Sequence, residues 1–152
     1  MEPDVEVCIR INRPAVEVWT AVADPSRFAQ WSPESSGASS RGPLVQGARF
    51  TGSNRNGPLR WSTACLVVES LPEGAFAFDV SFLGMSVARW RYQLTPDGEG
   101  CLVHEQWWDR RGPVMKVLGI VGTGVADRVE HNRRTMNQTL AGLKDDLEAS
   151  AG

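Results

Sequence analysis

The chain has 152 residues, and its 16 lysines and arginines against 18 aspartates and glutamates give a formal net charge of −2. Because this balance offers no basic stripe, we expect no nucleic acid partner. No run of 18 apolar residues occurs, and the acidic start MEPD lacks the features of a signal peptide. We therefore expect a single cytoplasmic domain over residues 1–152 without a membrane span.

Few residues have the chemistry of a metal or cofactor site. The three cysteines, Cys8, Cys65 and Cys101, are too scattered for a disulfide framework or a zinc site, and we expect buried free thiols. The two histidines, His104 and His131, lack metal-ligand spacing, and no phosphate loop, dinucleotide fingerprint or nucleophile elbow occurs. The sequence therefore predicts no metal and no cofactor. Six tryptophans and five phenylalanines suit a thick core or a pocket for an apolar ligand.

The first third of the chain predicts a strand, two short helices and a loop. Apolar residues at every second position predict a strand over residues 5–11. Residues 15–22 carry one apolar helical face, and a second helical turn is expected before Pro33. The serine-, glycine- and proline-rich stretch 32–43 predicts a loop, with at most a weak strand around residues 38–41.

The middle of the chain predicts an antiparallel meander. Asn56-Gly57 is the strongest hairpin signal, and the broken alternation at Cys65-Leu66-Val67-Val68 indicates a bulge. A meander of this kind normally has one covered face and one solvated face. The predicted strands are residues 47–55, 59–70, 76–82, 88–94 and 101–109.

One long amphipathic helix is predicted between Val125 and Leu147, and we expect the sheet to fold around it. Its apolar residues recur at offsets of three, four and seven, which places them on one helical face. Asn132 interrupts this face, either because it lines a polar cavity or because it bonds to a neighbouring backbone group. The apolar stripe comprises Val125, Val129, Met136, Leu140, Leu143 and Leu147.

The segment of residues 110–124 is apolar but contains four glycines and one proline. It is expected to be loosely ordered or to form a broken helix. Two interpretations remain open. The segment forms a flap over one end of a cavity, or it is a first part of the long helix packed on the core.

This order of elements resembles the helix-grip fold of the START-like (SRPBCC) superfamily, in its polyketide cyclase/dehydrase and lipid-transport branch. The resemblance implies an α+β fold, in which a curved antiparallel sheet of about six or seven strands wraps around a long C-terminal helix. Two short helices follow the first strand. The residues that carry the resemblance are Ile11-Asn12-Arg13-Pro14-Ala15, Val18, Trp19, Asp24-Pro25, Trp31, Gly47-Ala48-Arg49-Phe50, Trp61, residues 72–78 and residues 90–96.

The resemblance also implies a small apolar or aromatic, polyketide-like ligand in an internal cavity. One function is a cyclase/aromatase-like enzyme of secondary metabolism that uses general acid–base catalysis. The alternative is a non-catalytic carrier or a sequestering resistance protein. In the self-sacrifice members of this superfamily, a bound reactive molecule takes hydrogen from a glycine, and Gly112 is the candidate here. A third reading, a partner-binding module, uses the apolar stretch Met115–Val121. We expect a monomer or a weak homodimer.

The candidate catalytic residues are Tyr92 and Glu105. Tyr92 alternates in phase with Trp90, so its hydroxyl points inward as a catalytic group or as a core tyrosine bonded to the backbone. Glu105 shares its phase with Trp107, whereas the opposite phase would bury His104. A carboxylate in an aromatic cavity is costly unless it is paired, and such positions are often functional.

Arg55 and His104 are weaker candidates, and Arg89 and Arg91 are expected on the solvated face of the sheet. The same phases predict the side chains that line the cavity. These are Trp61, Phe78, Val80, Trp90, Tyr92, Trp107, Val129, Asn132 and Met136.

Overall fold

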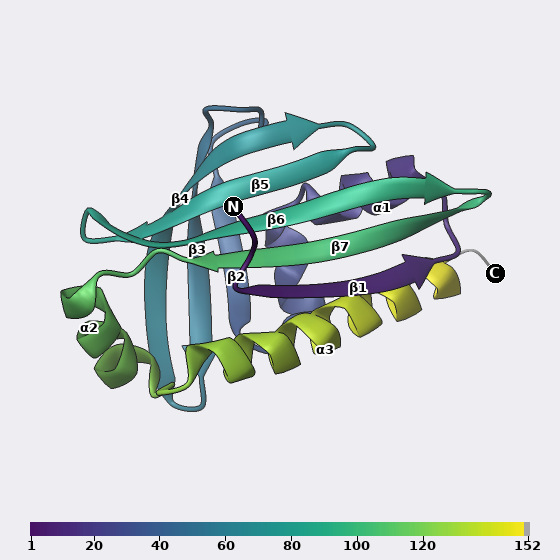
Figure 1. The fold of residues 1–152 in the computed structure, drawn as a ribbon. Helices are drawn as coiled ribbons and strands as arrows, with labels where there is room; N and C mark the ends of the chain where they lie inside the picture. Colours follow the sequence, from purple (N-terminus) through teal and green to yellow (C-terminus); the bar gives the residue numbers. More distant parts are fainter. Residues whose placement is uncertain (151–152) are drawn as a thin grey trace.

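The computed structural model describes residues 1–150 and has a curved antiparallel sheet that encloses a long C-terminal helix, which confirms the α+β helix-grip fold (Figure 1). The elements in chain order are β1 (Val5–Ile11), α1 (Ala15–Val22), the 3-10 helix η1 (Pro25–Gln30), β2 (Ser35–Ser40), β3 (Arg49–Asn56), β4 (Leu59–Leu71), β5 (Ala75–Phe82), β6 (Met85–Asp97), β7 (Gly100–Asp109), α2 (Pro113–Thr123) and α3 (Arg128–Ala149).

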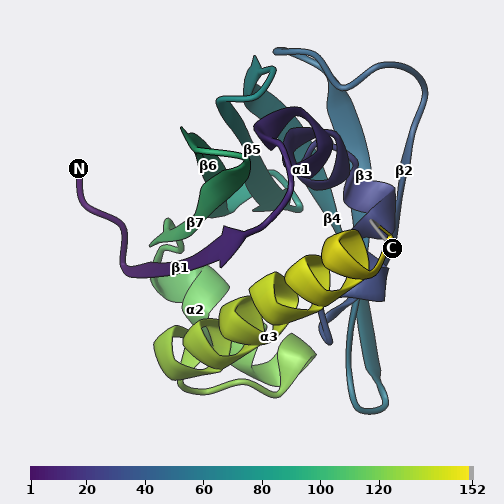
Figure 2. The same cartoon turned by 90° about the vertical axis from the view of Figure 1, so that its right-hand side faces the viewer.

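The seven strands are arranged in the order β1-β7-β6-β5-β4-β3-β2. β1 pairs with β7, so the first and last strands of the chain are neighbours, and β2 forms the opposite edge. β2 is longer than the weak strand expected around residues 38–41. The hairpin at Asn56-Gly57 and the bulge after Val67 were both predicted correctly. Figure 2 shows α3 crossing the concave side of the sheet.

The core forms where α3 faces the sheet. Met136, Leu140, Leu143 and Leu147 are buried against residues of β1, α1 and β7. Full burial of each such side chain stabilises the fold by about 1.5–3 kcal/mol. A second cluster, centred on Phe76 and Phe78, contains five buried residues from β3, β4 and β5. The candidate cavity lies between these two clusters.

The long helix begins three residues later than predicted. The Asp127 side chain accepts a hydrogen bond from the backbone N–H of Glu130, and this cap starts α3 at Arg128. Val125 is buried but precedes the helix. Val129 is 41% exposed, so its assignment to the buried stripe was wrong. It lies in the first turn of α3, where a side chain can remain uncovered even on the inner side of a helix.

Residues 113–123 form a separate helix, α2, so the expectation of a broken helix is confirmed and that of loose order is wrong. The break is at Gly124, which has a φ of 73° and ends α2 in a left-handed cap. Met115 and Gly119 are the buried residues of α2. This helix packs against β4 and β6 at one end of the molecule (Figure 1).

Cys65 and Cys101 are buried as expected, but Cys8 is exposed. Cys8 lies in the outward phase of β1, and its Sγ is 3.6 Å from Nε2 of His104 on the outer face of the sheet. The expectation of three buried thiols was therefore wrong for Cys8. Within residues 1–150, none of the helices is long and apolar enough to cross a membrane.

Candidate functional site

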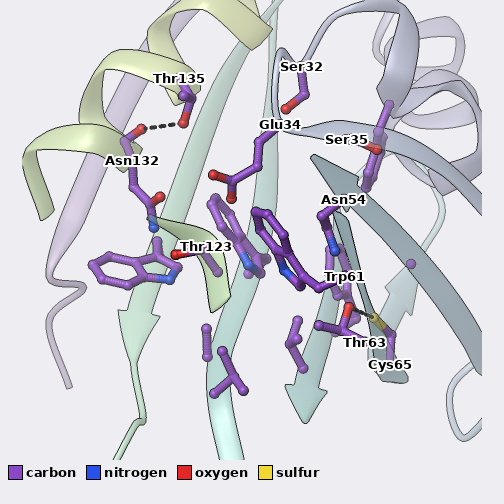
Figure 3. Close-up of a pocket in the computed structure, with 18 of the residues that line it drawn as sticks. Ser32, Glu34, Ser35, Asn54, Trp61, Thr63, Cys65, Thr123, Asn132 and Thr135 are labelled. Atoms are coloured by element: carbon purple, nitrogen blue, oxygen red, sulfur yellow. Dashed lines mark hydrogen bonds between the residues drawn. The ribbon is translucent and has the colours of Figure 1, made fainter. Parts of the chain in front are cut away.

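A cavity of about 210 Å³ lies between the concave face of the sheet and the inner face of α3. Its walls come from β2 to β7, from η1, α2 and α3, and from the loop that leads into β2. Figure 3 shows Asn132 extending from α3 into this space, opposite Asn54 and Trp61 from β3 and β4. α2 closes one end through Met115 and Gly119, which favours the interpretation of this segment as a flap.

The structure brings eight of the nine predicted lining residues together around the cavity. Val129 is the exception, since it is not among the lining residues and lies at the surface. The eight are Trp61, Phe78, Val80, Trp90, Tyr92, Trp107, Asn132 and Met136.

Tyr92 and Glu105 form a buried pair at the inner end of the cavity. They lie directly opposite each other on β6 and β7. The Tyr92 hydroxyl donates a hydrogen bond of 3.1 Å to Oε2 of Glu105. Glu105 is 2% exposed, and its other oxygen, Oε1, has no hydrogen-bond partner. The inward phase of β7 is therefore that of Glu105, and the alternative in which Tyr92 bonds to the backbone does not hold.

Burial changes the protonation of this pair. Desolvation raises the pKa of Glu105 from 4.5 to about 8, although the hydrogen bond from Tyr92 acts in the opposite direction. Desolvation and the neighbouring Glu105 raise the pKa of Tyr92 well above its usual value. At neutral pH the carboxyl group is therefore largely protonated. It can donate a hydrogen bond through Oε1 to an acceptor in the cavity.

Aromatic rings form one part of the cavity wall, and polar residues such as Asn54, Thr63 and Thr139 form another part. Trp90 and Trp107 lie beside Tyr92 and Glu105, with ring centroids 6.3 Å apart. Phe78 contacts Phe28 and Phe50, with centroid distances of 6.1 and 5.2 Å. Aromatic side chains in a cavity wall are typical of sites for apolar ring systems.

A cluster of ionic groups lies at the other end of the cavity, between the loop before β2 and the start of α3. Nη1 of Arg128 donates to both carboxylate oxygens of Glu34, at 2.8 and 3.0 Å. Nε2 of His131 lies 2.7 Å from Oε2 of the same carboxylate. Arg128 also donates to Oδ1 of Asn132 and to Oγ1 of Thr123. Glu34 and Arg128 both line the cavity, so this network forms part of its wall.

Sequence reasoning missed this ionic cluster. Glu34 and Arg128 are 94 positions apart, and Glu34 lies in a stretch read as a polar loop. No local pattern links two such positions. The capping residue Asp127, three positions before Glu130, was a usable signal for the start of α3, which determines where Arg128 and His131 project.

The remaining candidates lie outside the cavity. His104 points to the outer face of the sheet, where its Nδ1 is 3.8 Å from Glu6. Arg55 is exposed, and its Nε donates to the backbone oxygen of Pro33. Gly112 precedes α2 and is not among the residues that line the cavity.

Arg89 and Arg91 lie on the outer face as predicted, where they pair with Asp79 and Glu69. Among residues 1–150, no group of three or more histidines, cysteines or acidic residues is placed to hold a metal ion.

Residues 2–148 match the family model described as polyketide cyclase / dehydrase and lipid transport. The chain belongs to this family. No protein among the curated proteins matches the sequence. A polyketide-cyclase-like protein from Corynebacterium glutamicum, known from a solution NMR structure, is 25% identical with a TM-score of 0.64. The alignment covers 97% of this chain and 92% of that one.

Two further solved structures share the fold. DynU16, from the dynemicin biosynthetic locus, is 22% identical with a TM-score of 0.66, over 96% of this chain and 47% of that one. StfQ, a di-domain ARO/CYC protein from the steffimycin biosynthetic pathway, is 16% identical with a TM-score of 0.73, over 97% and 51%. The chain therefore spans about half the length of these two proteins. In this member of the polyketide cyclase / dehydrase family, the concave side of the shared fold holds the ring-lined cavity.

Proposed function

We propose that this protein binds a small aromatic, polyketide-like molecule in its cavity, with a ligand carbonyl at Glu105. The observation that carries the proposal is the unpartnered Oε1 of Glu105, which lies in the cavity wall beside aromatic rings. A buried polar atom without a partner is costly, and a ligand acceptor at this position would remove that cost. Membership of the polyketide cyclase / dehydrase family supports this choice of ligand.

The size of the cavity limits the ligand. A cavity of about 150 Å³ in another protein accommodates benzene, and the volume here is about 210 Å³. A bicyclic aromatic core is therefore the natural first probe. Its ring faces would meet Trp90, Trp107 and Phe78, while a carbonyl oxygen attached to the core would accept a hydrogen bond from the neutral Glu105 carboxyl group.

The same pair supplies the groups that a cyclisation needs. In its ionised form Glu105 takes a proton from a CH₂ group between two carbonyls, and the resulting enolate carbon bonds to a further carbonyl carbon of the same molecule. The protonated Glu105 then returns the proton to the new alkoxide. A pKa of about 8 suits both steps, because a general acid–base group works best near the ambient pH. Tyr92 holds Oε2 in place through its hydrogen bond.

A non-catalytic carrier or sequestering protein is the second candidate. It is favoured by the raised pKa of Glu105, because this group then offers a neutral hydrogen bond rather than a charge at neutral pH. The two candidates share the binding site and differ only in turnover. A stoichiometric complex with a poly-ketone substrate that is recovered unchanged would favour the carrier. Formation of a cyclised product, lost in Glu105→Leu, would favour the enzyme.

The binding proposal is tested by equilibrium dialysis with 2-acetylnaphthalene and with 2-ethylnaphthalene, which lacks the carbonyl oxygen. At pH 6.5 the ketone should bind about tenfold or more tightly than the hydrocarbon, because only the ketone satisfies Glu105. The preference should fall at pH 9.5, where Glu105 is ionised and no longer donates.

Glu105→Leu should abolish the preference for the ketone at both pH values. Glu105→Gln should make it independent of pH, because an amide donates throughout this range. His104→Gln is the matched control on the outer face of the same strand and should behave like the unmodified protein. Equal binding of both probes by the unmodified protein at pH 6.5 would contradict the proposed role of Glu105.

A further inference from the structure

One amide side chain, that of Asn132, is buried on the inner face of α3. It is 2% exposed and lines the cavity. The other buried residues of α3 are threonines, leucines and a methionine. Asparagine favours helices less than leucine or methionine does, and a buried amide costs free energy unless both of its ends are bonded. Neither helix formation nor core packing therefore explains an asparagine at this position.

Arg128 fixes the orientation of the Asn132 amide. Nη1 of Arg128 donates to Oδ1 of Asn132 at 3.3 Å, from four positions earlier in the same helix. A guanidinium group has only donors, so the amide atom that faces it must be the oxygen. The same guanidinium is bonded to Glu34 and Thr123, which hold it in place. The amide nitrogen, Nδ2, therefore faces away from Arg128 and into the cavity (Figure 3).

The Asn132 nitrogen has no acceptor within residues 1–150. The contact with Arg128 is the only hydrogen bond of the side chain there. The neighbouring hydroxyl groups give their protons to the helix backbone, Thr135 to the carbonyl oxygen of Asn132 at 3.2 Å and Thr139 to that of Thr135 at 2.7 Å. Among the buried residues of α3 that the structure describes, Asn132 alone keeps a free donor for a molecule in the cavity.

Glu105 offers a second free group from another wall of the cavity. It lies on β7, its Oε1 has no partner, and its carboxyl group is largely protonated at neutral pH. The cavity therefore has one unpaired donor on α3 and another on β7, each on a residue that is 2% exposed. An apolar ring system between them would leave both donors unpaired. A ligand with acceptor oxygens at two positions would satisfy both.

We propose that Asn132 selects ligands that carry a second acceptor oxygen, in addition to the carbonyl oxygen at Glu105. The ligand class is then an aromatic molecule with oxygen substituents at two or more positions. This inference rests on the proposed function, because it requires an aromatic ligand in the cavity. Trp90 and Trp107 lie beside Glu105, so a ligand with one oxygen keeps it at Glu105 while its rings contact these indoles. Only a second oxygen then reaches Asn132.

The test is equilibrium dialysis at pH 6.5 with two diketones, 2,6-diacetylnaphthalene and 2,7-diacetylnaphthalene. Each is compared with the compound that carries an isopropenyl group in place of one acetyl group, so that a CH₂ group replaces the second oxygen in the same shape. At least one diketone should bind about fivefold or more tightly than its comparison compound, because its second oxygen accepts a hydrogen bond from Nδ2 of Asn132. Two isomers are used because they direct this oxygen differently.

Two variants of Asn132 separate hydrogen bonding from structural damage. Asn132→Leu should remove the gain from the second oxygen and keep the preference for 2-acetylnaphthalene over 2-ethylnaphthalene, which depends on Glu105. In Asn132→Asp one oxygen still accepts from Arg128, but the atom that faces the cavity becomes an acceptor. The diketone should then bind more weakly than its comparison compound. The acetylnaphthol with its hydroxyl group at the favoured position should bind about threefold more tightly than it binds the unmodified protein, whereas structural damage would weaken all these compounds alike.

Asn137→Leu is the matched control on the same helix. The Asn137 amide is exposed and donates to the backbone oxygen of Arg133, so this variant should keep the gain. Equal binding of each diketone and its comparison compound, together with a preference for 2-acetylnaphthalene over 2-ethylnaphthalene, would overturn this inference and leave the proposed function intact. Loss of that ketone preference as well would overturn both. A gain that persists in Asn132→Leu would also overturn the inference, since another group would then bind the second oxygen.

Discussion

The carboxyl groups at the two ends of the cavity, those of Glu34 and Glu105, differ in their burial and in their hydrogen bonding. At the outer end, Glu34 has both oxygens bonded, to Arg128 and to His131. At the inner end, Glu105 is more deeply buried, receives one hydrogen bond from Tyr92 and has one oxygen without a partner. The outer carboxylate has hydrogen-bond partners for both oxygens, whereas the inner one is largely protonated at neutral pH and has one oxygen without a partner.

This difference separates a structural role from a binding role. The bonds of Glu34 join the loop before β2 to the start of α3, so they hold two distant parts of the chain together. Glu105 joins only neighbouring strands that the sheet already holds. Burial of Glu105 therefore destabilises the fold without joining distant parts of the chain. A ligand that bonds to its free oxygen is the simplest way to offset this free-energy cost.

The largest expected effect is the pH dependence of stability that arises from Glu105. Its pKa is higher in the folded state, about 8, than the unperturbed value of 4.5, so the proton stabilises the native state. This stabilisation is complete below about pH 4.5 and is lost as pH rises towards 8. The expected slope is about 1.4 kcal/mol per pH unit.

Urea unfolding between pH 5 and 9 measures this slope. The unmodified protein should lose stability relative to Glu105→Gln as pH rises, because the amide cannot ionise. If the free energies of unfolding of the two proteins changed in parallel with pH, Glu105 would be ionised in the folded state throughout this range. Glu105 would then not differ from Glu34 in the way described above.

Removal of the outer carboxylate should have the next largest effect. Glu34→Ala leaves Arg128 and His131 without their common partner, and the side chain of Arg128 is only 11% exposed. We expect a loss of about 2–3 kcal/mol in the free energy of unfolding. Glu17→Ala, which removes the more exposed pair with Arg13, should cost less than about 1 kcal/mol. A similar cost for both variants would mean that the cluster does not hold the loop to α3.

Loss of the Tyr92 hydroxyl should have a smaller effect. Tyr92→Phe leaves both oxygens of Glu105 without a partner and should cost about 1–2 kcal/mol. It should also raise the pKa of Glu105 further, because the hydrogen bond from Tyr92 lowers it. In a double-mutant cycle, Tyr92→Phe should cost much less in a Glu105→Leu background. Strict additivity would show that the two residues are not coupled.

The smallest effect is expected at Val129. Because its side chain is 41% exposed, Val129→Gln should change stability by less than about 0.5 kcal/mol. Met136→Ala, seven residues along the same helix and 1% exposed, should cost about 2–5 kcal/mol. Thermal unfolding of both variants compares the outer and inner parts of α3. A large loss of stability in Val129→Gln would show that the Val129 side chain is buried after all.

The sequence predicted most of the fold because its signals are local. Alternation located the strands, Asn56-Gly57 located a hairpin, and the spacing between Met136 and Leu147 located the long helix. The inner end of the cavity could be predicted for the same reason, since Tyr92 and Glu105 share a phase with neighbouring tryptophans.

The outer end could not be predicted in this way. Glu34 meets Arg128 only because the whole sheet curves around α3, and no sequence spacing encodes this approach. Val129 was assigned wrongly because periodicity ignores where a helix begins. Cys8 was expected to be buried because cysteines usually are, although the alternation of β1 places it on the outer face. The order of α2 depends on packing against β4 and β6, which composition does not show.

The most direct test of the account is the titration of the Glu105 side chain itself. NMR of protein with ¹³C-labelled glutamate, assigned with Glu105→Gln, follows its carboxyl carbon as pH rises. We expect a midpoint near pH 8 in the free protein and a changed chemical shift when 2-acetylnaphthalene binds. A midpoint near 4.5, with no response to the ketone, would contradict the claim that a neutral Glu105 receives the ligand.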